Sequence, residues 1–276
     1  MTFTGAIGRA CLLPLQAIIA ASVRLRIHPN VLTVVGVVIN MIAAYLLGND
    51  HFRWAGVVML VANIFDYIDG KVARESGRES LFGGFWDSVM DRFSDITLFI
   101  GLIYLYSHLH RPDYVIICAL AMMFSVMTSY TRARAESLIE KCKVGFMERP
   151  EWIVLFMIGA ITNRMAGVLW VILVLSIVTV ADRIYFTWRE LSHSPKVEDV
   201  LLERRRTLTD GVKKVVTAPA LFLWRAFFWT YERATWQYDL WVIAILGFVW
   251  LIPPAWLRDP LEHGHGLIGW LLEHAW

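Results

Sequence analysis

The sequence predicts an all-helical, polytopic membrane protein: a bundle of six transmembrane helices with an N-terminal interfacial helix and a Trp-rich helical C-terminal appendage. Two observations predict this class. Hydrophobic residues make up 57% of the 276 residues, and the mean hydropathy is +0.53, whereas soluble domains contain roughly 45 to 50% apolar residues. The apolar residues also gather into stretches of about 20, the length that a helix needs to cross a bilayer.

Six apolar stretches justify the six helices in chain order. They lie at about 31–48, 54–72, 81–107, 113–131, 150–163 and 166–187. The connections between them contain Gly, Asn, Asp, His or Pro, which are typical of turns. The sequence therefore predicts a transmembrane domain over residues 29–190.

The two ends of the chain differ from this central part. Residues 1–28 contain an apolar run without the charged region and cleavage site of a signal peptide, and we expect an interfacial helix there. Residues 191–276 are first charged and then hold eight of the thirteen tryptophans. They predict a separate extension, with a candidate seventh span at 240–256 that Pro253 and Pro254 interrupt.

The distribution of basic residues predicts the orientation. Lys and Arg gather before the first stretch and after the second and fourth, whereas the opposite connections hold only Arg53, Arg111 and Arg164. By the positive-inside rule, the N-terminus and the basic loops face the cytoplasm, as in a multi-pass protein of the cytoplasmic membrane.

The net charge of +2 is too small to indicate a nucleic-acid partner. The three cysteines have no metal-site or disulfide spacing.

The segment DYIDGKVARESGRESLFGGFWDSVMD, residues 66–91, places four carboxylates in two predicted membrane helices. Each Asp at the centre of such a helix costs roughly 2.5 to 3.5 kcal/mol on insertion scales, so a compensating partner is expected. Helical spacing puts two groups of residues on one face each, one on either side of a turn near Gly77. These groups are Asp66, Asp69, Gly70, Ala73 and Arg74, and then Gly83, Asp87 and Asp91. The two acidic faces can therefore meet at similar depth, near the cytoplasmic surface.

Converging carboxylates suit hard cations such as Mg²⁺ or Mn²⁺, which often bridge substrate phosphates. The small residues on the same faces leave room for a bulky ligand, and Arg74 offers a fork that can clamp a phosphate. This combination indicates metal-assisted transfer at a phosphorus centre. A polar seam with buried Asp–Arg pairs is the alternative, although a seam requires neither four acids nor the glycines.

The spacing D-x2-D-G-x2-A-R-x8-G-x3-D-x3-D resembles the motif of the CDP-alcohol phosphatidyltransferase family. The resemblance covers about residues 25–190 and implies a six-helix membrane fold, pairing as a homodimer, and a site for two Mg²⁺ or Mn²⁺ ions. It implies transfer of a phosphatidyl group from a CDP-linked lipid, CDP-diacylglycerol or an ether analogue, to an alcohol hydroxyl with release of CMP. Metal ligands by resemblance are Asp66, Asp69, Asp87 and Asp91, and Asp91 is also the general base. CDP-lipid contacts by resemblance are Asn30, Thr33, Gly70, Ala73, Arg74 and Gly83.

Two further stretches, SYTRARAES at 129–137 and VGFMERPEW at 144–152, resemble the branch of the family that transfers to inositol phosphate. A phosphorylated acceptor requires cations, and motif position assigns its phosphate to Arg132, Arg149 and Arg183. The alternative explanation for these residues is topological, because the positive-inside rule also places Arg at cytoplasmic helix ends.

Other functions stay open on the sequence. The acceptor could be glycerol 3-phosphate, serine or another alcohol. Intramembrane prenyltransferases also use acidic helices with magnesium, but their two acidic motifs lie far apart in sequence. A non-enzymatic transporter or channel would place charge along a pore rather than gather it at one membrane face.

Overall fold

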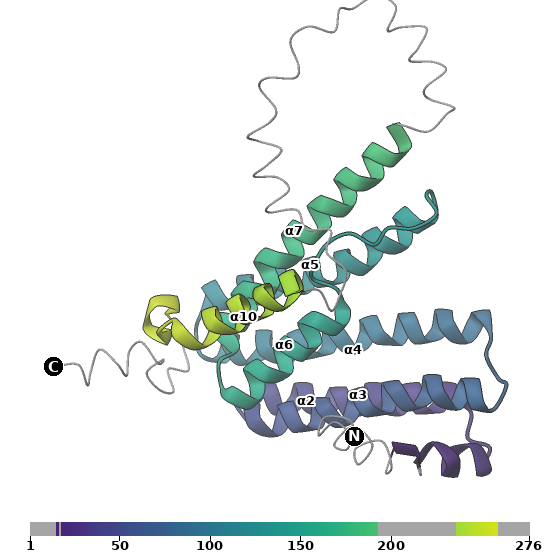
Figure 1. The fold of residues 1–276 in the computed structure, drawn as a ribbon. Coiled ribbons are helices and arrows are strands. Elements are labelled where there is room, and N and C mark those ends of the chain that lie inside the picture. Colours follow the sequence, from purple (N-terminus) through teal and green to yellow (C-terminus); the bar gives the residue numbers. More distant parts are fainter. Residues whose placement is uncertain (1–14, 17, 193–235, 259–276) are drawn as a thin grey trace, which may run out of the picture. The chain divides into compact units, whose positions relative to one another are not determined.

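The computed structural model describes residues 15, 16, 18–192 and 236–258, and all the regular elements in this part are helical (Figure 1). The elements are α2 (Pro29–Gly48), α3 (Phe52–Glu75), α4 (Leu81–His108), α5 (Pro112–Glu136), α6 (Arg149–Thr162), α7 (Met165–Ser192), α10 (Trp236–Leu251) and the 3-10 helix η1 (Pro254–Leu257). Helices α2 to α7 lie at the six predicted apolar stretches. The prediction of an all-helical chain is therefore confirmed for the described residues.

Three of these helices are long and apolar enough to cross a membrane: α2, α5 and α7. Helices α3 and α4 have 24 and 28 residues, but both contain residues of the acidic motif. Helix α6 has 14 residues, or about 21 Å at 1.5 Å per residue, which is short of a hydrocarbon core of about 30 Å. The chain thus has membrane-spanning character, while the count of six crossings stays a prediction.

The chain divides into two compact units, of which the first comprises residues 1–118 and 157–163. In this unit α2 packs against both α3 and α4. A Cβ on Gly101 of α4 would collide with the carbonyl oxygen of Ala44 in α2, so glycine is needed for this close approach. Asn40 Nδ2 donates to Ser94 Oγ at 2.5 Å between the same two helices.

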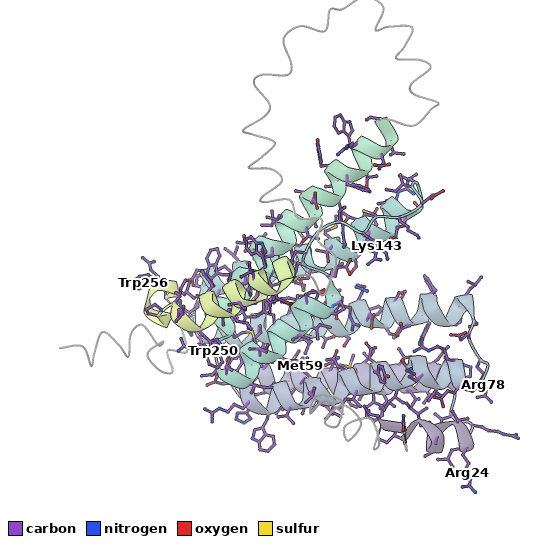
Figure 2. All side chains as sticks on the ribbon, viewed as in Figure 1. Arg24, Met59, Arg78, Lys143, Trp250 and Trp256 are labelled. Atoms are coloured by element: carbon purple, nitrogen blue, oxygen red, sulfur yellow. The ribbon has the colours of Figure 1, made fainter. Side chains whose placement is uncertain are left out.

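The predicted N-terminal helix is described only from residue 15 onward, with residue 17 excepted, and residues 18–24 are helical. Ile19 is buried in a cluster with Leu32 of α2 and with Ile68 and Val72 of α3. Arg24 points away from the helices (Figure 2). This segment therefore packs against α2 and α3, and its location in the membrane interface stays a prediction.

A tight turn joins the two acidic helices. Gly77 has φ +63, in the left-handed region that favours glycine, and Ser80 caps α4 by accepting a hydrogen bond from the Gly83 N–H at 2.9 Å. Arg78 lies at this turn (Figure 2) and donates from Nη1 to the carbonyl oxygen of Arg26 at 3.2 Å. The predicted turn near Gly77 is therefore present, and it is tied to the segment that precedes α2.

The second unit comprises residues 119–156 and 164–276. In it α10 and η1 pack on α7, where a Cβ on Gly167 would lie 3.5 Å from Leu257 and 3.7 Å from Val249. Helix α10 ends at Leu251, just before Pro253 and Pro254, as expected from the missing N–H of proline. The charged stretch 193–235 and residues 259–276 lie outside the described residues.

Candidate active site

Three of the four predicted carboxylates come together in the first unit. Asp66 and Asp69 of α3 and Asp87 of α4 each offer an oxygen, and these oxygens lie within 4.8 Å of one another. The i, i+3 spacing puts the first two on one face of α3, and the Gly77 turn returns α4 so that Asp87 reaches the same place. The acidic faces of the two helices therefore meet as the spacing predicts.

Helix α2 supplies a hydrogen-bond donor to this cluster. Thr33 Oγ1 donates to Asp69 Oδ2 at 2.5 Å and also lies 3.3 Å from the Pro29 carbonyl oxygen. Thr33 and Asp69 are 6% and 5% exposed. The hydroxyl satisfies one carboxylate oxygen and fixes the Asp69 rotamer, a contact that sequence reasoning missed.

A cavity of about 410 Å³ opens beside these carboxylates. Its walls come from α2, α3, the Gly77 turn and α4. The predicted site residues that line it are Asn30, Thr33, Asp66, Asp69, Gly70, Ala73, Arg74, Gly83 and Asp87. Arg78 and Glu79 of the turn also line it, and sequence reasoning did not select them. All the predicted CDP-lipid contacts thus surround one cavity.

Asp91 lies one helical turn beyond Asp87, and it is not among the described residues that line the cavity. Its carboxylate is 3.8 Å from the guanidinium of Arg92, which is also 3.8 Å from Asp95. Side-chain exposure of Asp91 is 13%. The fourth acid of the motif therefore stands beside the cluster of three, next to a cation.

The small residues of the motif determine how closely other groups approach. A Cβ on Gly70 would lie 3.6 Å from Arg74 Nη2, so the Arg74 guanidinium lies across this glycine. A Cβ on Gly83 would be 3.1 Å from Ser80 Oγ and 3.9 Å from Asn30 Oδ1. A methyl group at Gly83 would therefore crowd the Ser80 cap of α4, whereas one at Gly70 would make an ordinary contact with the Arg74 guanidinium.

The donor set fits a hard divalent cation. Carboxylate and hydroxyl oxygens are the donors nearest the centre of the cluster, and Mg²⁺ and Mn²⁺ prefer oxygen ligands. Three ionised carboxylates so close together repel one another unless positive charge lies between them. The cavity next to the cluster leaves room for a phosphate-containing ligand on its open side.

A second polar cluster lies in the other unit and centres on Arg183 of α7, which is 2% exposed. Arg183 Nε donates to the Val144 carbonyl oxygen at 3.0 Å, Nη1 donates to the Thr128 carbonyl oxygen, and Nη2 donates to Glu148 Oε1 at 3.0 Å. The guanidinium thus joins α5, the α5–α6 connection and α7.

Glu148 also accepts from the second predicted arginine. Arg132 Nη1 donates to Glu148 Oε1 at 2.9 Å, and Arg132 Nε donates to Glu136 Oε1 at 3.2 Å. Arg149, the third predicted cation, follows directly as the first residue of α6. Sequence reasoning selected the cations and missed Glu148. The sequence signal for a partner was that Arg183 interrupts the apolar run IVTVADRIYF, because a charge buried among apolar residues requires a partner of opposite charge.

Comparisons with known proteins identify relatives of this chain. Residues 26–181 match the family model described as CDP-alcohol phosphatidyltransferase. An archaetidylinositol phosphate synthase from Pyrococcus horikoshii is 34% identical over 173 residues, which cover 62% of this chain and 89% of that protein. A phosphatidylinositol phosphate synthase from Mycobacteroides abscessus is 31% identical over 175 residues, covering 60% of this chain and 80% of that protein.

Solved structures agree with these relatives. The phosphatidylinositol phosphate synthase of Mycobacterium tuberculosis with CDP-DAG bound has a TM-score of 0.60 and 28% identity, covering 63% of this chain and 93% of that chain. The same enzyme in complex with manganese and citrate also has a TM-score of 0.60 and 28% identity, over 63% of this chain and 88% of that chain. Because the family match covers more than half of the 276 residues, this chain belongs to the CDP-alcohol phosphatidyltransferase family and is an enzyme of that class.

Proposed function

We propose that this enzyme transfers a phosphatidyl group from CDP-diacylglycerol, or an ether analogue, to a hydroxyl of inositol phosphate and releases CMP. The observation that carries the proposal is the cluster of three carboxylates beside a cavity of about 410 Å³. The relatives named as inositol phosphate lipid synthases support the acceptor.

In this proposal Asp66, Asp69, Asp87 and Asp91 hold two Mg²⁺ or Mn²⁺ ions. Bound there, the ions would offset the charge of the diphosphate and stabilise the charge that develops during transfer. The hydrogen bond from Thr33 supports the geometry by holding the Asp69 carboxylate in one orientation.

Asp91 is the proposed general base. Its carboxylate accepts the proton of the acceptor hydroxyl as the hydroxyl oxygen forms a bond to the phosphorus on the lipid side of the diphosphate. The bond from that phosphorus to the CMP oxygen breaks, and CMP leaves with the electron pair. The Arg92 guanidinium lies 3.8 Å from the Asp91 carboxylate, so a positive charge stands beside the proposed base.

The rest of the cavity wall binds the CDP part of the donor in this proposal. Arg74 donates to a phosphate through two N–H groups, and Gly70, Ala73 and Gly83 leave the space that the ligand occupies. Asn30 and Thr33 present polar groups from the start of α2.

The acceptor phosphate binds near Arg132, Arg149 and Arg183. Arg132 has 34% side-chain exposure and offers N–H groups directly. Arg183 is buried, and it contributes its charge while its hydrogen bonds hold Glu148 and Val144 in place. Arg132 and Arg183 also pair with Glu136 and Glu148, and a phosphorylated acceptor would bind their remaining N–H groups, an advantage that a neutral acceptor lacks.

The proposed membrane arrangement follows the basic residues. Residues 29–190 form a domain with six crossings, and its active site faces the cytoplasm at the cytoplasmic membrane. Residues 1–28 lie in the interface, residues 191–276 form a separate extension, and two copies associate as a homodimer. Cysteine accessibility from each side of sealed vesicles tests this arrangement.

The test of function is CMP release from CDP-diacylglycerol. Inositol phosphate, inositol, glycerol 3-phosphate and serine are compared as acceptors, each with Mn²⁺, with Mg²⁺ and with a chelator. We expect release only with a divalent ion, and the highest kcat/KM with inositol phosphate. Release in the chelator overturns the metal-assisted mechanism, whereas a preference for glycerol 3-phosphate or for plain inositol overturns only the acceptor.

A further inference from the structure

The segment Val144–Glu148 is held firmly against α7. Gly145 has φ +92, and a Cβ there would collide with the methyl group of Thr179. The Met147 N–H donates to Thr179 Oγ1 at 3.0 Å, and Arg183 Nε donates to the Val144 carbonyl oxygen. The segment ends at Glu148, which accepts from two of the proposed acceptor-binding arginines. The position of the segment therefore determines where Glu148 holds the guanidinium groups of Arg132 and Arg183.

Helix α10 contributes one side chain, that of Trp241, to a small cavity beside this segment. Trp241 lines a cavity of about 30 Å³ together with Gly145, Phe146, Thr179 and Asp182. The space is small enough to leave room for little more than water. At the other end of α10, Val249 is 3% exposed, and its Cα lies 3.7 Å from a Cβ placed on Gly167 of α7. This contact fixes the helix on α7.

Asp182 is a buried acidic residue in the wall of this cavity. The residue is 7% exposed, and its carboxyl group interacts with the backbone N–H of Gly145. In the part of the chain that the structure describes, its Oδ2 atom has no hydrogen-bond partner. A water in this small space would satisfy that oxygen. The Trp241 ring lies across the same space from Gly145 and Phe146, so its loss would enlarge the cavity and remove packing surface from the segment.

We propose that Trp241 is a positioning residue for the segment Val144–Glu148, so that α10 acts as a built-in cover for the acceptor-binding part of the enzyme. The proposal rests on the proposed acceptor site. Helix α10 lies outside residues 26–181 that match the family model. The cover is thus a feature that the C-terminal extension adds to the family domain.

Cys142 reports on this segment without any assay of activity. Its side chain is fully buried against Ala135 and Val144, and burial raises the pKa of the Cys142 thiol. Both effects slow alkylation in the closed state. In full-length protein with Cys11 and Cys118 replaced by Ala, we expect Trp241→Ala to speed alkylation of Cys142 by about tenfold, the effect of easier local opening.

Trp250→Ala is the matched control, because Trp250 lies on the same helix and is 56% exposed. It should leave the alkylation rate unchanged. Trp241→Phe keeps an aromatic ring at the cavity and should restore most of the protection. If Trp241→Ala does not fold, Trp241→Leu carries the test, because it removes the ring and keeps an apolar side chain. An alkylation rate in the folded Ala or Leu variant equal to that of the parent protein overturns the proposed role of Trp241.

Activity then separates the two proposals. We expect Trp241→Ala to raise the KM for inositol phosphate by about tenfold with little change in the KM for CDP-diacylglycerol, as expected when acceptor binding alone is weakened. Faster alkylation with an unchanged acceptor KM upholds the cover but overturns the placement of the acceptor at this segment. If the acceptor panel identifies another alcohol, the same measurement is made with that alcohol.

Discussion

Thr33 shows how a single hydroxyl supports the acidic cluster. It lies on α2, while the carboxylate that it contacts lies on α3, so the hydrogen bond fixes Asp69 from outside its own helix. Groups that orient metal ligands in this way typically contribute 10- to 100-fold to metal affinity or activity, as a rough guide.

Thr33→Val keeps the shape of the side chain and removes the hydroxyl. We expect the Mn²⁺ concentration for half-maximal CMP release to rise by about 10- to 100-fold, and Thr33→Ser to restore the parent value. Thr97→Val is the control, because the Thr97 hydroxyl donates to its own helix at Phe93 on an exposed face. An unchanged metal requirement in Thr33→Val would show that the hydrogen bond does not orient a ligand.

The acidic residues could be predicted from the sequence, but their partners could not. Asp66 and Asp69 share one face of a helix by their spacing, and the short turn near Gly77 returns the next helix so that Asp87 can reach them. The hydrogen bond from Thr33 to Asp69 joins positions 36 apart, and the one from Arg183 to Glu148 joins positions 35 apart. Contacts of this kind depend on how helices pack, which no local pattern determines.

At the scale of elements, the approach of α4 to α2 depends on Gly101. We expect Gly101→Ala to destabilise the protein by about 1 to 3 kcal/mol, because its methyl group must displace the backbone of Ala44. Thermal unfolding in detergent measures the effect as a lower Tm. Gly247→Ala is the control, since its Cβ would meet only Leu251 at 3.8 Å. Equal Tm values for Gly101→Ala and the parent would mean that the two helices separate at no cost.

The helix positions could also be predicted, but two of the ends could not. The apolar stretches end at 131 and 187, whereas α5 continues to Glu136 and α7 to Ser192. The added residues, 132–136 and 188–192, include three Arg, two Ala and two Glu, all of which have high helix propensity. An apolar stretch ends at its first charged residue. The helix continues past that residue where the charged side chains pair with one another, as Arg132 does with Glu136.

For the molecule as a whole, the acidic cluster links stability to metal binding. Divalent ions that bind only the folded state stabilise it by about 2.7 kcal/mol at 100 times the dissociation constant. Without ions, the close carboxylates of Asp66, Asp69 and Asp87 repel one another and destabilise the folded state. Removal of one of these charges should therefore raise the stability of the metal-free protein and reduce the stabilisation that metal ions provide.

We expect Mn²⁺ to raise the Tm of the parent protein, and Asp87→Asn to abolish most of this rise while it raises the Tm in chelator. The two curves of Tm against Mn²⁺ concentration should therefore cross. Asp113→Asn is the control, because Asp113 is an exposed acid paired with Arg111 outside the cluster, and its variant should keep the full response to Mn²⁺. An Asp87→Asn protein that responds to Mn²⁺ as the parent does would show that the stabilising ions bind elsewhere. A Tm in chelator that falls below the parent value would show that Asp87 stabilises the metal-free fold by a contact stronger than the repulsion.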